Sequence, residues 1–143
     1  MSTGRRRGLV RGLSPSIEAV LVVPVIVLLV GVMTAGFRLW QGRADIDQVA
    51  GAAARAASQA RSTAEARHRI STVVTSNSLP CDNPVIASDL TGFAAPLGAA
   101  AQVTVTITCR VGLADLLVPG LPGSQQVSGS GSSALDPYRK RNP

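Results

Sequence analysis

An uncharged and almost wholly apolar stretch, residues 19–37, constrains the fold of this chain more than any other feature. A helix needs roughly 20 apolar residues to cross the hydrocarbon core of a bilayer, which is about 30 Å thick. The stretch meets this length and exceeds the roughly 7–15 apolar residues of a cleavable secretory signal. We therefore predict one transmembrane helix over residues 17–37 that stays attached to the chain. Signal-peptidase cleavage after Ala35 is the alternative.

The positive charge is unevenly distributed around this stretch. Residues 1–16 carry four arginines and no acidic side chain, within a formal net charge of +6 for the whole chain. Basic residues beside a membrane span favour the cytoplasmic side. We therefore expect residues 1–16 to be a cytoplasmic leader and the C-terminal part to be extracytoplasmic, in a single-pass protein of the cell membrane. Because this topology accounts for the charge, a nucleic-acid partner is not expected.

Composition argues against a chemical site. About 100 residues follow the span, enough for one small domain. Aromatic residues make up only 3% of the chain, and large ligand pockets depend on such side chains. Two cysteines and the single His68 fall short of a recognisable set of metal ligands. We expect no enzymatic activity, no cofactor, no metal and no small-molecule substrate.

Residues 38–76 have the composition of an alanine-rich extracytoplasmic helix. Small apolar residues recur there at spacings of three and four: Ile46, Val49, Ala53, Ala56, Ala60 and Ala64. Such spacing predicts one apolar stripe along a helix. We expect this helix to continue from the membrane span as a single stalk of roughly 50 residues. The stripe would pack on the chain's own domain or on another molecule.

Residues 77–137 are predicted to form a small β-rich domain. Apolar and polar side chains alternate strictly over residues 102–111, which predicts a half-buried strand with Cys109 on its buried face. Residues 125–135 are expected to return as an antiparallel partner strand, although their Ser-Gly-rich centre is also typical of a linker. Residues 138–143 are expected to be a basic, solvated tail.

The two cysteines, Cys81 and Cys109, both follow the span. An even number of cysteines in an oxidising compartment indicates a disulfide. It would close a loop of about 28 residues and stabilise a small domain by roughly 3 kcal/mol. Two unpaired buried thiols are the alternative.

The N-terminal motifs resemble the class III signal of type IV pilin-like proteins. The matching residues are Arg11-Gly12, then Glu18, then an apolar run that contains Pro24. More narrowly, the chain is similar to the TadE-like proteins, minor pseudopilins associated with tight-adherence (Flp) pilus assembly. Four later motifs also fit: Gly-Phe-Arg-Leu-Trp at 36–40, Ala-Ala-Arg-Ala-Ala within 52–57, Val-Thr-Val-Thr-Ile-Thr-Cys at 103–109 and Ala-Leu-Asp-Pro-Tyr-Arg at 134–139.

The resemblance implies processing at the N-terminus. A prepilin peptidase would cleave after Gly12, so that Leu13 becomes the first residue and the apolar helix remains attached. In pilin-like assemblies the glutamate neutralises the new terminal amine as helices stack, and Glu18 would take this role. Glu18 lies one position further from the glycine than this family usually places it. An uncleaved anchor, in which Glu18 only stabilises the start of the helix, therefore stays open.

The resemblance also implies a fold and a function. The fold would be α+β and pilin-like, with a long N-terminal helix and a small antiparallel β domain. The function would be assembly of a tight-adherence type pilus or a related surface secretion apparatus. Its partners would be the membrane, other pilin-like or pilus-assembly proteins and a prepilin peptidase. The alternative is a membrane-tethered extracytoplasmic binding module that uses its helix only as an anchor.

Overall fold

The computed structural model describes residues 14–116, 120 and 123–140, without the side chains of residues 14–19 and 82. Its elements are the helices α1 (Ser14–Ser58) and α2 (Thr63–Ser76), the strands β1 (Asp82–Asp89), β2 (Ala101–Gly112) and β3 (Ser124–Leu135), and the short 3₁₀ helices η1 (Thr91–Ala94) and η2 (Ala114–Leu116). The predicted α+β fold, a long N-terminal helix with a small antiparallel sheet, is confirmed.

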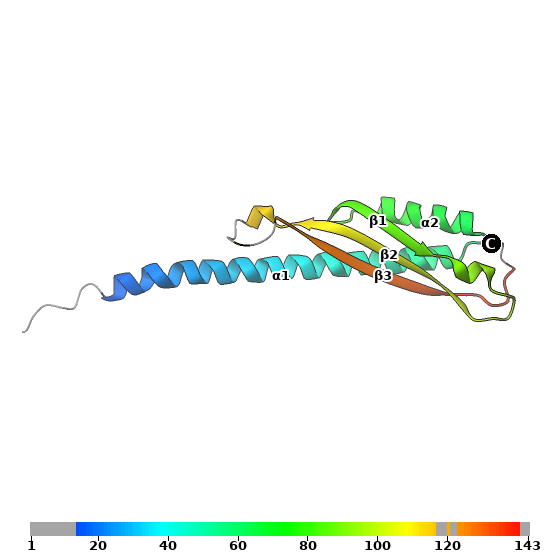
Figure 1. The fold of residues 1–143 in the computed structure, drawn as a ribbon, viewed down its shortest axis with the longest axis horizontal. Coiled ribbons are helices and arrows are strands. Elements are labelled where there is room, and N and C mark those ends of the chain that lie inside the picture. The colour runs from blue at the N-terminus through cyan, green and yellow to red at the C-terminus, as the bar shows by residue number, and fades with distance from the viewer. Residues whose placement is uncertain (1–13, 117–119, 121–122, 141–143) are drawn as a thin grey trace, which may run out of the picture.

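Figure 1 shows α1 running through most of the length of the molecule. The sheet, of order β1-β2-β3 and antiparallel throughout, lies along the C-terminal half of α1 together with α2. The N-terminal half of α1 extends beyond them. We call residues 20–37 of α1 the rod, and the described residues from 38 to 140 the head.

Strand β2 supplies the centre of the core. Val103, Val105 and Ile107 are fully buried on its inner face, and Cys109 follows them in the same alternation. The threonines between them are half-buried on the outer face. The half-buried strand predicted from alternation is therefore confirmed.

Strand β3 approaches α1 closely because its inward positions include glycines. A Cβ atom at Gly131 would collide with the backbone of Gly51 and Ala50 in α1. The neighbouring Ser130 N–H donates to Oδ1 of Asp47 at 2.9 Å, which holds this edge strand on the helix. The Ser-Gly-rich segment is thus a strand, and its glycines permit close packing. The linker alternative is wrong.

The predicted continuous stalk is wrong in one respect, because the helix breaks after Ser58. Ser62 has extended backbone angles and its hydroxyl accepts from the N–H of Glu65, which begins α2. The Glu65 carboxylate in turn accepts from the N–H of Arg61 at 2.9 Å. This arrangement is close to a capping box, whose Ser-x-x-Glu pattern is present in the sequence. The prediction from alanine-rich composition missed this break.

The predicted apolar stripe is only partly buried in the structure. Ile46, Val49, Ala53 and Ala60 are buried as expected, whereas Ala56 is half-buried and Ala64 is exposed. Ala64 follows the break and belongs to another helix. The buried surface of α1 is also wider than one stripe, since α2 and the sheet both pack on it. The stripe therefore packs within the chain's own head.

Strand β1 was not predicted, because its first residues are of types that favour a turn. Asn83 has a left-handed backbone (φ 49°) and Pro84 lacks an N–H donor. Both lie where the register with β2 shifts, between Asp82 and Val85. A bulge in an edge strand accommodates such residues.

The basic tail is less free than predicted. Arg139 donates to the backbone oxygen of Gln59 at 3.1 Å, just past the C-terminus of α1. Tyr138 beside it is 88% exposed. Residues 141–143 lie outside the described residues. A cation that hydrogen-bonds a carbonyl near a helix C-terminus stabilises that helix end.

Candidate functional site

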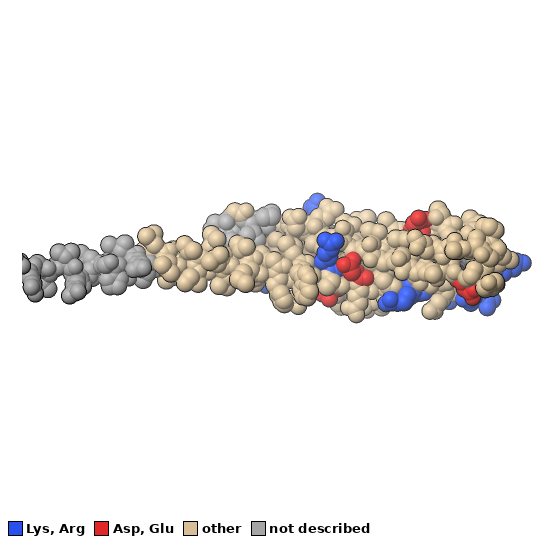
Figure 2. Space-filling model, turned by 90° about the horizontal axis from the view of Figure 1, so that it is seen from below, with Lys and Arg blue, Asp and Glu red and all other residues tan. Residues whose placement is uncertain are grey.

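The rod is a long apolar surface that the rest of the described chain leaves uncovered. Apart from Gly31, which is half-buried, and Ala35, which is buried, all its residues are exposed. Figure 2 shows charged side chains on the head and none on the rod. At 1.5 Å per residue the rod is about 27 Å long, close to the ~30 Å of a bilayer core. By length and composition, α1 can cross a membrane.

The backbone and side chains of the rod suit an apolar environment. A membrane span must satisfy its backbone polar groups internally, and a helix does so. Pro24 is the exception, because it lies inside the helix and lacks the N–H that would bond one turn back. Thr34 is the one polar side chain of the rod, and its hydroxyl donates to the backbone oxygen of Val30 at 2.8 Å. The rod therefore presents no unpartnered side-chain donor to its surroundings.

An ion pair joins the first residue of the head to η2, next to the end of the rod. Arg38 donates to Asp115 of η2 at 2.6 Å, and both side chains remain partly exposed. This hydrogen bond lowers the pKa of Asp115 below its ordinary value. The pair thus links the first turn of the head to the connection after β2.

We expect Arg38→Gln to raise the pKa of Asp115 toward its ordinary value. Without the guanidinium the carboxylate loses its positively charged donor and binds a proton more readily. An NMR titration of the Asp115 carboxyl measures this shift. Asp89 is the internal control, because Thr91 and not Arg38 lowers its pKa. An unchanged Asp115 titration would show that the pair does not form in solution.

The predicted processing residues are only partly described. Gly12 and Leu13 lie outside the described residues. Glu18 lies near the start of α1 by its backbone, and its side chain is outside the described part. Cleavage after Gly12 and the role of Glu18 therefore stay predictions.

The predicted disulfide between Cys81 and Cys109 is present, with a Cα–Cα distance of 5.8 Å. It joins the segment just before β1 to the inner face of β2. The alternative of two free thiols is wrong. The bond therefore attaches the beginning of the edge strand to the centre of the core.

Groups suited to chemistry do not converge in the part of the chain that is described. It contains no cluster of three or more His, Cys, Asp or Glu side chains that could hold a metal. His68 is exposed on α2. One surface hollow of about 440 Å³ lies over the sheet and is lined by residues that include Asn83, Thr108 and Arg110.

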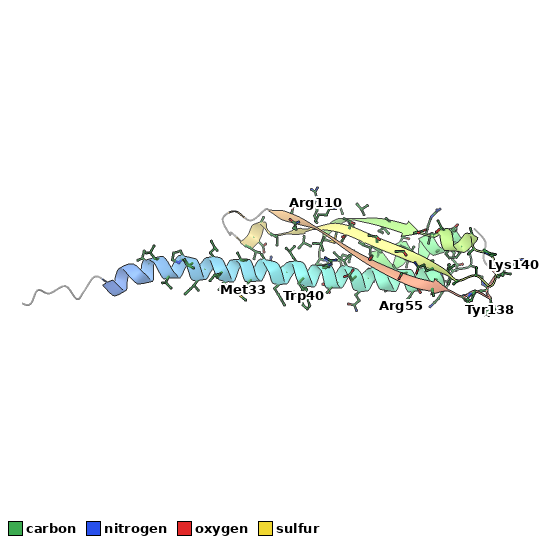
Figure 3. All side chains as sticks on the ribbon, turned by 60° about the horizontal axis from the view of Figure 1, so that its bottom comes forward. Met33, Trp40, Arg55, Arg110, Tyr138 and Lys140 are labelled. Carbon is green, nitrogen blue, oxygen red and sulfur yellow. A yellow bond between two sulfur atoms is a disulfide. The ribbon has the colours of Figure 1, made fainter. Side chains whose placement is uncertain are left out.

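Aromatic and basic side chains gather at the end of the rod and just beyond it. The rings of Phe37 and Trp40 lie 6.1 Å apart between centroids, and both are more than half exposed. Figure 3 shows Trp40 projecting from α1 between Met33 and Arg55. Arg43 follows one turn later and borders the same hollow as Trp40. Sequence reasoning did not single out Arg43, although aromatic and basic residues after an apolar run are a known signal of a membrane interface.

Comparison of this chain with protein-family models, curated proteins and solved structures finds no match. The features that bear on function are therefore those of the chain itself. They are the exposed rod, its unbroken connection to the head, and the aromatic and basic residues at the junction.

Proposed function

We propose that this chain is a membrane-anchored, pseudopilin-like protein that takes part in assembling a tight-adherence type pilus or a related surface secretion apparatus. In this proposal the N-terminus is cytoplasmic, the rod spans the membrane and the head is extracytoplasmic. The observation that carries the proposal is the continuity of α1, which forms the exposed rod and also contributes buried residues to the core of the head.

This continuity suits a subunit that assembles through its helix. No loop separates the rod from the buried residues Ile46, Ala50 and Ala53. A displacement or rotation of the rod is therefore transmitted directly to the sheet that packs on those residues. A tether for an independent binding domain needs no such coupling, and a flexible linker would serve it equally well.

The N-terminal motif supports the same proposal. Arg11-Gly12 and Glu18 resemble a prepilin-peptidase signal in front of a helix that remains attached. A carboxylate at the edge of an apolar span needs a positive partner. Cleavage after Gly12 would supply one as the new amine of Leu13, within the assembly.

A second candidate function is a tethered binding module. The hollow beside Thr108 and Arg110 favours it, because outer-face side chains of β2 line this hollow and one of them is cationic. Under this candidate the rod acts only as an anchor. The two candidates therefore differ in whether the identity of the rod matters.

Exchange of the rod tests this difference. We expect a chain whose residues 20–37 are replaced by an unrelated apolar helix of equal length to reach the membrane but lose pilus assembly. Glu18→Ala should impair assembly, whereas Glu18→Asp, which keeps the charge, should retain part of it. Pilus formation in cells that lack the native copy is the measurement, with membrane recovery of each variant as the control. Full assembly by the exchanged chain would favour the tethered module.

A further inference from the structure

A hollow of about 320 Å³ lies on the head immediately beyond the rod. Leu39, Trp40 and Arg43 of α1 line one side of it. The first residues of β3 line the other side: Gln125, Gln126, Val127 and Ser128. The hollow thus combines an indole, an aliphatic surface, a guanidinium and two amides.

The position of the hollow along α1 places it at the depth of lipid headgroups if the rod spans the bilayer. Trp40 lies about 4.5 Å beyond Phe37 along the helix axis, and Arg43 about 9 Å beyond it, at 1.5 Å per residue. The polar layer on each side of a bilayer core is roughly 5–8 Å thick. Arginine also extends its charged end over several ångströms. The indole therefore lies at the edge of the core, and the guanidinium within reach of the phosphates.

The charge of the hollow suits an anion. Arg43 makes no ion pair or hydrogen bond with any residue that the structure describes. Among the described residues, no acidic side chain lines the hollow. The acidic group one turn further along α1, Asp47, accepts the N–H of Ser130. Asp45 borders different hollows, one of them shared with Arg38.

We propose that this hollow binds the phosphate of an anionic phospholipid, with Arg43 as the charged contact, Gln125 and Gln126 as further donors, and Trp40 against the glycerol and upper acyl chain. The proposal rests on the membrane span of the proposed function and is independent of pilus assembly. Because α1 is continuous, a lipid held there fixes how the head sits on the membrane surface.

Trp40 is the only tryptophan of the chain, so its fluorescence reports on this hollow alone. The full chain is reconstituted in phosphatidylcholine vesicles that contain equal fractions of chain-brominated phosphatidylglycerol or chain-brominated phosphatidylcholine. Bromine quenches tryptophan only at short range. We expect the phosphatidylglycerol to quench Trp40 more strongly, with a local preference of up to about fivefold, the equivalent of ~1 kcal/mol for one basic side chain at a membrane surface.

Three variants assign the preference to Arg43. Arg43→Gln should abolish the preference and Arg43→Lys should keep most of it. Arg55→Gln is the matched control, because Arg55 is exposed on the same helix about 18 Å further from the membrane, and this variant should behave as the wild type. The intact disulfide and the circular dichroism spectrum verify that each variant is folded.

The other outcomes contradict the proposal in distinguishable ways. If the chain does not float with the vesicles in a density gradient, both the membrane span and the lipid site are contradicted. A floating chain that both lipids quench equally, or an Arg43→Gln variant that keeps the preference, contradicts the lipid site alone. Loss of the preference on adding inorganic phosphate, at ionic strength matched with chloride, identifies a soluble anion as the ligand and also contradicts the proposal.

Discussion

Replacement of Gly131 by alanine is expected to destabilise the head by about 3 kcal/mol, the upper end of the usual cost of overpacking. The added methyl group would occupy the space of the Gly51 and Ala50 backbone, which cannot move without shifting all of α1. For a head of this size the midpoint of thermal unfolding should fall by roughly 12–24 °C. Differential scanning calorimetry of the full chain in detergent micelles measures the change.

Two other glycines provide controls for this substitution. A Cβ atom at Gly51 would meet only the end of the Arg55 side chain, at 3.9 Å, although Gly51 itself contacts Gly131. We therefore expect Gly51→Ala to be neutral or to stabilise the helix by up to ~1 kcal/mol. Gly112→Ala should also be neutral, since no atom of the described residues lies within 4 Å of the added atom. If Gly131→Ala and Gly51→Ala were equally harmless, β3 would not pack on α1 as described.

Loss of the disulfide is the second large effect. Replacement of Cys81 and Cys109 by alanine is expected to destabilise the head by about 3 kcal/mol, because an unfolded chain without the bond between residues 28 apart regains conformational entropy. The bond also holds the start of the edge strand β1, whose other edge no described strand pairs with. Calorimetry in detergent again measures the shift of the unfolding midpoint.

A reducing agent provides the matched control for the cysteine variant. Reductant should lower the unfolding midpoint of the wild-type chain by a similar amount and leave the double-alanine variant unchanged. A wild-type midpoint that does not respond to reductant, with the reduced thiols verified by labelling, would show that the bond contributes nothing to stability.

The elements with a clear periodicity could be predicted from the sequence. Strict alternation around Val105 and Ile107 predicted β2 and the inward direction of Cys109, because burial on one face of a sheet repeats every second residue. The continuous apolar run of residues 19–37 likewise predicted the exposed half of α1, because a membrane span must be predominantly apolar along its whole length. Where one physical requirement repeats along the chain, the pattern is enough.

The remaining elements depend on contacts that no local pattern displays. β1 forms through pairing with β2 despite Asn83 and Pro84, which locally favour a turn. In the sequence alone the glycines of β3 are typical of a linker. The structure shows that they pack against the α1 backbone. The Ser-x-x-Glu pattern of Ser62 and Glu65 indicates a helix start before α2. The prediction of one continuous helix relied on composition and did not use this pattern.

Some features of the candidate site could be predicted from the sequence, and others depend on the fold. The rod could be predicted because its length and composition are local properties. The partner of Arg38, which is Asp115, lies 77 residues away and follows from the fold alone. The hollow beside Trp40 and Arg43 likewise needs β3 to complete it. Processing after Gly12 stays a prediction from the N-terminal motif, because Gly12 lies outside the described residues.

The intact mass and the first residue of the chain, extracted from the membranes of its own cells, show whether the rod and the head remain one molecule. We predict one species that begins at Leu13 and needs detergent for its release. A chain that still begins at Met1 would contradict processing and leave a plain anchor. A detergent-free species that begins at Gly36 would show that the rod and the head do not remain one molecule.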